Sequence, residues 1–209
     1  MKQNEYTVSG FAGLLGSDAP APGGGTAAVL EGALGAALTE MVCRLTAGRA
    51  KYAGHEALIL DVQSRAEALR DRLLEAMEAD TAAFLLVSNA FAMPKGTSEE
   101  KAARSAAIQR GLEKCTEVPL EGMELAAQAL ELAASILGKF NENAASDLGV
   151  ASLSLRVGVQ GTWLNVLINA ASLKDRAFAE DALAKGRAIL DRALPLADRI
   201  FGEIEASLL

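Results

Sequence analysis

The chain has 209 residues, a formal net charge of −7 and 51% hydrophobic residues, of which few are aromatic. This length suffices for one large domain with a substantial core, and nothing in it requires a second domain. The acidic balance, without a long run of Lys or Arg, argues against a nucleic-acid partner, whose phosphates need a basic surface. Two distant cysteines and one histidine are too few for a tetrahedral zinc site, so we expect no metal.

The start of the chain, MKQNEYTVSG, lacks the apolar segment of a secretory signal peptide. The most apolar stretch, residues 19–47, is interrupted by Glu31, Glu40 and Arg44, so no charge-free run approaches the roughly 20 residues that a bilayer requires. We therefore expect a cytoplasmic protein without a membrane partner.

Ala and Leu dominate the apolar residues, and no segment alternates as a strand would. Proline and glycine divide the chain into long pieces. We predict an all-α fold, one bundle of long antiparallel helices over residues 1–209. The expected helices cover residues 5–16, 25–51, 54–92, 98–115, 119–138, 143–172 and 175–208.

A glycine-rich turn, residues 22–26, leads into the second expected helix. Pro22, Gly23, Gly24, Gly25 and Thr26 are its members. Backbone N–H groups at such a turn, at the positive end of a helix, suit an anionic or carbonyl-bearing ligand. The alternative is a tight turn that only starts the helix, with Thr26 as its cap.

The helix that follows this turn carries two further patterns. Its residues Ala28, Gly32, Gly35 and Thr39 keep one face small, which predicts close packing, within the bundle or across a dimer axis. Beyond it lies a basic segment without an acid. Arg49 and Lys51 belong to this segment, which either binds an anion or complements the helix dipole.

An acidic residue interrupts the apolar stripe of the third expected helix. The stripe comprises Val62, Ala66, Leu69, Leu73, Met77, Asp80, Phe84 and Val87. A carboxylate in such a place is protonated, paired with a cation or strongly hydrogen-bonded, and these conditions tune a group for proton transfer. The alternative is a structural partnership with an arginine at the edge of the stripe.

The stretch from 141 to 175 is rich in amides for an apolar helix. Asn165 and Asn169 lie one turn apart on the same face, where they either bind the edge of a heterocyclic ligand or form a polar network that fixes helix register. Asp147, after Ser146, is typical of the first turn of a helix.

Several of these motifs, in this order, resemble the cyclodeaminase domain of formiminotransferase-cyclodeaminase and its stand-alone bacterial relatives, some described as methenyltetrahydrofolate cyclohydrolases. The motifs are PAPGGGTAAVLEGALGAALTEMV, LTAGRAKY, EADTAAFLLVSNAFAMPKGTSEEKAAR, AIQRGLEKCTEVPL, SDLGVA and WLNVLIN. The resemblance covers residues 5–205. It implies an all-helical homodimer that binds a tetrahydrofolate derivative in a groove near the dimer interface.

The resemblance also implies roles for residues. Asp80 and Asp147 would be catalytic, and Asp80 would be the general acid or base. The substrate-binding residues would be Pro22, Gly23, Gly24, Gly25, Thr26, Arg49, Lys51, Asn141, Asn165 and Asn169. The basic segment would attract a polyglutamate tail, and no cofactor beyond the tetrahydrofolate substrate is expected.

This sequence departs from the family pattern at Gly149, where Gln is common, and at Trp163-Leu164, where Tyr-Phe is frequent. Both departures put the exact substrate preference in question. The expected reaction is cyclodeamination or cyclohydrolysis at the carbon that bridges two folate nitrogens. The alternative from another class is a non-catalytic helical dimer that binds folate or serves assembly.

Overall fold

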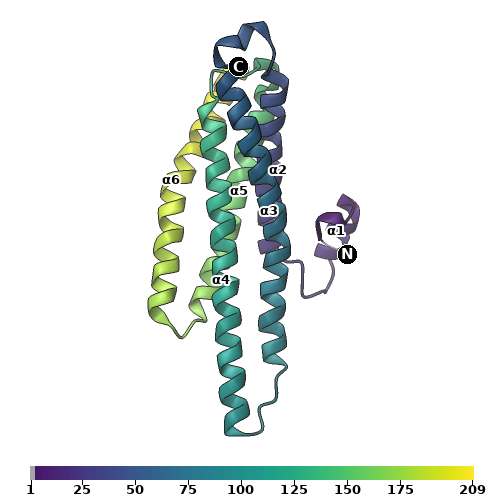
Figure 1. Cartoon of the computed structure of the whole chain (residues 1–209), viewed down its shortest axis with the longest axis vertical. Coiled ribbons are helices and arrows are strands. Elements are labelled where there is room, and N and C mark those ends of the chain that lie inside the picture. Colours follow the sequence, from purple (N-terminus) through teal and green to yellow (C-terminus); the bar gives the residue numbers. More distant parts are fainter. Residues whose placement is uncertain (1–2) are drawn as a thin grey trace.

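A computed structural model of the chain describes residues 3–209, which form six α-helices and no strand in that range (Figure 1). The all-α prediction is confirmed. The helices are α1 (Val8–Leu15), α2 (Gly24–Thr46), α3 (Glu56–Phe91), α4 (Ser98–Ser135), α5 (Ala145–Ala171) and α6 (Arg176–Leu208). Short 3-10 segments cover Gln3–Glu5, Ala50–His55 and Glu142–Ala144.

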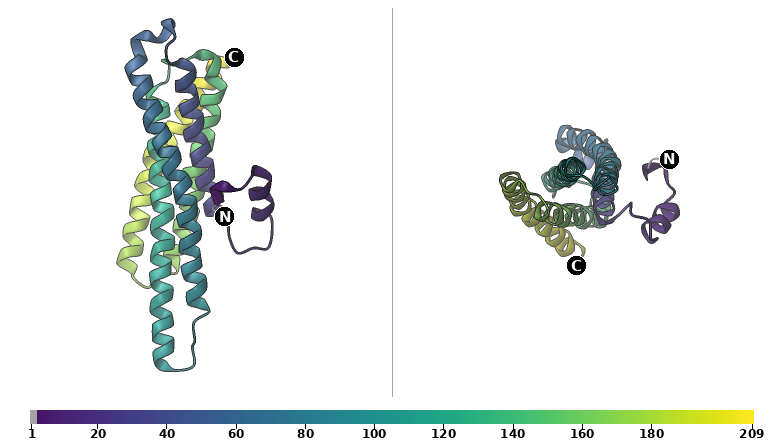
Figure 2. Two further views of the ribbon diagram at one scale, coloured as in Figure 1. Left: turned by 45° about the vertical axis from the view of Figure 1, so that its right-hand side comes forward. Right: turned by 90° about the horizontal axis from the view of Figure 1, so that it is seen from below.

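The five long helices lie side by side along the long axis of the molecule, whereas α1 stands off to one side (Figures 1 and 2). The lower ends of α3 and α4 extend beyond the other helices as a two-helix hairpin. The segment before α1 is tied to α3, because the backbone N–H of Asn4 donates to Glu78 at 3.1 Å.

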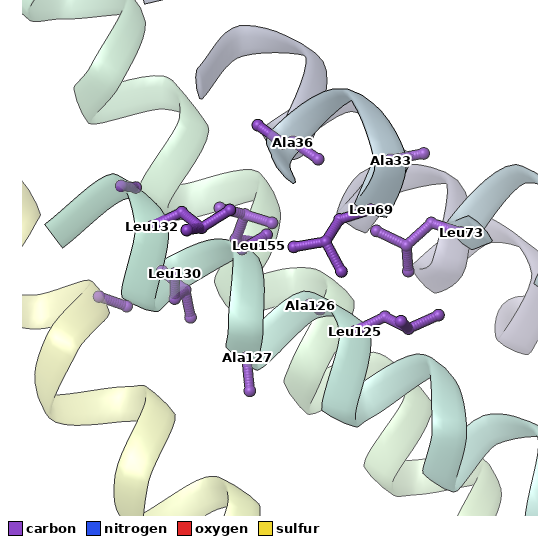
Figure 3. Packing of buried hydrophobic residues seen from close by; sticks show 14 of the residues in the cluster. Ala33, Ala36, Leu69, Leu73, Leu125, Ala126, Ala127, Leu130, Leu132 and Leu155 are labelled. Carbon is purple, nitrogen blue, oxygen red and sulfur yellow. The ribbon is translucent and has the colours of Figure 1, made fainter. Parts of the chain in front are cut away.

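Alanine and leucine fill the core, as the scarcity of aromatic residues predicts. Ala33 and Ala36 of α2 and Leu69 and Leu73 of α3 pack with α4 and α5 side chains (Figure 3). The predicted stripe of α3 is buried over most of its length, but Asp80 is half-buried and Phe84 is 39% exposed. The stripe therefore leaves the core at Asp80.

The small face of α2 packs against α5 of the same chain. A Cβ atom on Gly35 would lie 2.5 Å from Leu155, and one on Gly158 would lie 2.9 Å from the Cα atom of Gly32. The small face was predicted to pack either within the bundle or across a dimer axis, and the structure shows packing within the bundle. The glycines permit two helix backbones to approach closely.

Gly158→Ala is expected to lower the free energy of unfolding by about 1–3 kcal/mol, because the added methyl group meets backbone that cannot rotate away. Chemical denaturation measures the loss. The matched control is Gly202→Ala, since a Cβ atom there meets nothing within 4 Å and the residue lies inside α6. The control should raise stability by about 1 kcal/mol through helix propensity. Equal effects of both changes would contradict the packing argument.

The second expected helix ends earlier than predicted. α2 stops at Thr46, and Gly48 adopts a φ of 73°, which favours glycine. Arg49 and Lys51 therefore lie beyond α2, at the start of the 3-10 segment Ala50–His55. Arg44, which pairs with Glu40, is the basic residue in the last turn of α2 and can complement the dipole of that helix.

The predicted break between residues 115 and 119 is wrong, because α4 continues through Pro119 to Ser135. Proline has no N–H, so the carbonyl group of Cys115, four residues earlier, loses its helical donor. The side chain of Asn169 in α5 supplies one instead, with Nδ2 donating to the Cys115 oxygen at 2.7 Å. A tertiary hydrogen bond thus replaces the missing helical one.

α2 is the one helix in residues 3–209 whose length and composition would allow it to cross a membrane. In its most apolar window, 61% is buried inside the bundle. This burial is the usual property of a core helix, so the composition is weak evidence for a membrane span.

Candidate active site

The glycine turn forms an uncapped N-terminus of α2. The helix begins at Gly24, and Gly23 precedes it in an extended conformation without a side-chain hydrogen bond. Thr26, the expected cap, lies inside the first turn instead. N–H groups in a first turn have no intrahelical partner and carry partial positive charge. This helix end is therefore available to acceptors from elsewhere in the structure.

Asp80 of α3 lies against this helix end. The hydroxyl group of Thr26 donates to Asp80 Oδ2 at 2.7 Å. Burial raises the pKa of the Asp80 carboxyl group, and hydrogen bonds from the Thr26 side chain and backbone oppose this effect only in part. Asp80 thus partly replaces the missing cap and also holds a proton more readily than an ordinary aspartate.

Gly25 allows the close approach of three segments. A Cβ atom on Gly25 would lie 3.1 Å from Asp80 Oδ1 and 3.1 Å from Asn165 Oδ1. The glycine turn, α3 and α5 therefore meet at one point. The structure brings together Gly25, Thr26, Asp80 and Asn165 from the predicted set.

Asp80 differs from the other buried carboxylate in this core, Glu40. Glu40 is 5% exposed and pairs with two arginines, at 2.6 Å from Arg44 and 2.5 Å from Arg70. Asp80 forms no ion pair with any residue in the range 3–209. Of the expected states of a buried carboxylate, Asp80 has hydrogen bonds and a raised pKa but no cation, so the arginine partnership is not observed.

The two asparagines of α5 lie on the opposite wall. Asn165 Nδ2 donates to the backbone oxygen of Gly161 at 3.1 Å, and Asn169 Nδ2 donates to that of Asn165 at 2.8 Å. Both side chains are half-buried. These two bonds stay within α5, whereas the bond from Asn169 to the Cys115 oxygen links α5 to α4. Both side chains also border a cavity.

A cavity of about 320 Å³ lies between the glycine turn, α3, α4 and α5. Its predicted members are Gly23, Gly24, Gly25, Thr26, Asp80, Asn165 and Asn169. Residues not predicted from the sequence complete its wall: Pro20, Ala21, Thr81, Phe84, Cys115, Ile168 and Ser172. Carboxyl, amide, thiol and backbone groups thus face a space with apolar walls, as in many small-molecule sites.

Cys115 is one of three polar wall residues that were not predicted from the sequence, with Thr81 and Ser172. Burial, and then the negative charge of Asp80, raise the pKa of its thiol to about 11, so it remains protonated at neutral pH. A sequence signal did exist, because Cys115 precedes Pro119 by four residues in a long helical segment. A proline in that position marks a carbonyl group that needs another donor.

Other predicted residues lie at the opposite end of the bundle. Arg49, Lys51 and Asn141 border a second cavity of about 440 Å³. Lys51 pairs with Glu142 at 2.7 Å, whereas no ion pair in the described part of the chain involves Arg49. Asn141 is buried, and its Nδ2 donates to the Leu45 oxygen at 3.2 Å.

The two groups of predicted residues are far apart in one chain. α2 runs between them, and its length from Gly24 to Thr46 corresponds to about 33 Å. Asp147, half-buried in the first turn of α5, lies about 27 Å along that helix from Asn165. Pro22, the first residue of the glycine turn, is buried but does not line the Asp80 cavity.

The departures from the family pattern lie away from the Asp80 cavity. Trp163 packs against α6, where a Cβ atom on Gly186 would come within 2.3 Å of its ring. Leu164 is 65% exposed, and Gly149 faces Ile204 of α6. None of these residues lines the cavity.

Comparison with known proteins gives a family and a fold. Residues 7–188 match the family described as formiminotransferase-cyclodeaminase. A methenyltetrahydrofolate cyclohydrolase of Methylorubrum extorquens is 43% identical over 206 residues, which are 99% of each chain. The formimidoyltransferase-cyclodeaminase of Mus musculus is 33% identical over 202 residues, but the match spans 37% of that longer protein.

The crystal structure of a formiminotetrahydrofolate cyclodeaminase from Thermotoga maritima shares the fold, with a TM-score of 0.88 over 99% of both chains and 23% sequence identity. Together, the match over most of the chain and the relatives above 30% identity show that this chain belongs to the formiminotransferase-cyclodeaminase family.

Proposed function

We propose that this chain is a folate one-carbon enzyme that acts on the carbon bridging the two folate nitrogens. The 43% identity to a methenyltetrahydrofolate cyclohydrolase of the same length favours hydrolysis of the methenyl ring as its reaction. Formimidoyltetrahydrofolate cyclodeamination is the second reaction that the same site supports. The observation that carries the proposal is Asp80, a carboxyl group with no cation partner among residues 3–209 that faces a cavity beside an uncapped helix end.

In the hydrolytic reaction, water attacks the electrophilic carbon of the methenyl ring. The Asp80 carboxylate accepts one proton from this water as the C–O bond forms. The bond from carbon to the ring nitrogen then breaks, and that nitrogen receives a proton as the formyl group forms. The hydroxyl group loses its proton as the C=O bond forms, so one proton is released overall. A carboxyl group whose pKa is raised above that of an ordinary aspartate suits both transfers.

In cyclodeamination, the bridging nitrogen attacks the formimino carbon, and ammonia leaves after it has received a proton. Asp80 would deliver that proton. Both reactions need the two nitrogens held near each other and one proton carrier, so neither needs a cofactor beyond the folate. The free N–H groups of Gly24 and Gly25 and the amides of Asn165 and Asn169 are the groups that we propose to bind it.

We further propose that the enzyme is a homodimer. One face of the described structure, formed by α2 and α5, carries exposed large apolar side chains along its length. They are Leu34, Met41 and Leu45 on α2 and Val150, Leu153, Val157, Leu164 and Ile168 on α5. Apolar patches of this kind usually mark an interaction site.

A two-fold axis that lies in this interface, midway along the helices and perpendicular to them, would place the partner antiparallel. The Asp80 cavity of one protomer would then lie beside the Arg49 end of the other, because rotation about this axis reverses the direction of the helices. In a single chain, the residues at the Asp80 cavity and those at the Arg49 end are about 33 Å apart, too far to bind one substrate together. The antiparallel dimer would bring one group from each chain into a shared site. We propose that Arg49 and Lys51 there bind a polyglutamate tail.

We also place the protein in the cytoplasm. This proposal is supported by its two cysteines, Cys43 and Cys115, which are free and buried.

Two assays on the purified protein test the proposed function. The loss of methenyltetrahydrofolate absorbance measures hydrolysis, and the release of ammonia from formiminotetrahydrofolate measures cyclodeamination. We expect activity in the first assay. The variant Glu40→Gln, which changes a buried carboxylate outside the Asp80 cavity, should keep this activity as long as it is folded. Ammonia release alone would assign the second reaction. Folate binding without either activity would instead identify a non-catalytic folate-binding dimer.

A further inference from the structure

Pro119 lies one helical turn after Cys115, the α4 residue whose backbone oxygen accepts a hydrogen bond from Asn169 of α5. It is buried inside a continuous helix, and its missing N–H leaves the Cys115 carbonyl group without a helical donor. Asn169 donates to that oxygen at 2.7 Å from the neighbouring helix. Pro195 is a second proline inside a helix, but it lies exposed in α6, away from the cavity.

The hydrogen bonds of Asn169 determine which way its amide points. Nδ2 donates both to the Cys115 oxygen at 2.7 Å and to the Asn165 oxygen at 2.8 Å. An amide nitrogen has two hydrogens, so both are used, and only Oδ1 remains for a ligand. The reversed amide would place Oδ1 against two carbonyl oxygens, so these partners exclude it.

This geometry makes Asn169 a hydrogen-bond acceptor toward the cavity. Asn169 shares the cavity wall with Asp80 and Asn165. A ligand group that fits an acceptor of fixed direction is an N–H donor, such as those on the pterin ring. The ligand identity rests on the function proposed above, whereas the orientation of the amide does not.

We propose that Pro119 is a positioning residue for substrate binding. By freeing the Cys115 carbonyl group, it provides the acceptor that orients Asn169 and directs Oδ1 toward an N–H group of the substrate. With an ordinary residue at 119, the helix itself would supply an N–H to Cys115 and compete with the Asn169 amide for that oxygen.

Pro119→Ala tests this role, and Pro195→Ala is the matched control. Both changes should raise the melting temperature, because alanine restores a helical N–H and removes a proline from a helix interior. Only Pro119→Ala should raise the KM for methenyltetrahydrofolate, by about three- to tenfold as for one neutral hydrogen bond, while kcat stays within about twofold. Equal KM values for both variants and the wild type would overturn the proposal.

A second readout does not depend on enzyme activity. In an NMR spectrum of the labelled full chain, Asn169→Asp identifies the side-chain amide signal of Asn169. Its two hydrogens should exchange slowly in the wild type and in Pro195→Ala, and faster in Pro119→Ala. A wild-type protein that shows this pattern but no folate activity would contradict only the proposed function. Unchanged exchange in Pro119→Ala would contradict the positioning role itself.

Discussion

Asp80→Asn is expected to lower turnover of methenyltetrahydrofolate by about 10²-fold or more while the protein remains folded. Asparagine keeps the shape of the side chain and can still accept the Thr26 hydroxyl bond seen at 2.7 Å. It cannot accept a proton from water or return one to the ring nitrogen. The decrease in methenyl absorbance measures the rate, and near-normal turnover would contradict the catalytic role of Asp80.

The pH dependence of this enzyme should report the same carboxyl group. Burial raises the pKa of Asp80, and the base in hydrolysis is the charged form. The rate should therefore fall on the acidic side at a pH above the ordinary range of an aspartate. This acidic limb should be absent from the residual rate of Asp80→Asn.

The stability of this variant should change in the opposite direction to its activity. Because the pKa of Asp80 is raised in the folded state, its contribution to stability is present at low pH and is lost as the pH rises through that pKa. Asn is uncharged at every pH. Asp80→Asn should therefore be more stable than the wild type at neutral pH, and the difference should vanish in acid.

Glu40→Gln tests whether the gain in stability of Asp80→Asn is specific to Asp80 or follows from neutralising any buried carboxylate. Glu40 is paired with Arg44 and Arg70, so its neutral replacement removes two charge-assisted hydrogen bonds. Both arginines keep another acidic partner, Glu67 for Arg44 and Asp71 for Arg70. Losing these charge-assisted hydrogen bonds is expected to cost about 2 kcal/mol of unfolding free energy. Because Glu40 lies outside the Asp80 cavity, turnover of the folded control should stay close to that of the wild type.

Local sequence patterns predicted most of the helices, because apolar periodicity and glycine mark their faces and ends. The continuity of α4 could not be predicted in this way. A proline favours a break when only its own segment is considered. The donor that replaces the lost helical bond is Asn169, which lies 54 residues from Cys115 in the sequence.

For the candidate site too, local sequence patterns identified individual residues but not the contacts between helices. The stripe of α3 identified Asp80 as an exception, and the helical spacing placed Asn165 and Asn169 on one face. The contact of Asp80 and Asn165 with Gly25 depends on how α2, α3 and α5 cross, which no local pattern contains. The resemblance grouped Arg49 and Lys51 with Asp80, whereas the length of α2 separates them in a single chain.

This separation leads to the second large effect that we expect, in mixed dimers. Asp80→Asn and Asp147→Asn should each be nearly inactive alone if both aspartates act on one substrate. Asp147 lies toward the Arg49 end of the bundle, about 27 Å along α5 from Asn165. In the proposed dimer, each site would take Asp80 from one protomer and Asp147 from the other.

Unfolding and refolding the Asp80→Asn and Asp147→Asn variants together in equal amounts should then restore about a quarter of wild-type activity. Half of the dimers would be hybrids, and each hybrid would have one intact site of its two.

The double variant Asp80→Asn/Asp147→Asn, refolded with an equal amount of wild type, is the matched control. If sites are shared, every hybrid has one lesion in each site, and about a quarter of the activity of an all-wild-type sample remains. If each chain holds its own complete site, the same mixture retains about half, and the two single variants restore nothing. Full activity of Asp147→Asn alone would instead make Asp147 a first-turn acid of α5, as its position in the helix also allows. The paired mixtures thus distinguish a site built across the apolar face of α2 and α5 from one contained in a single bundle.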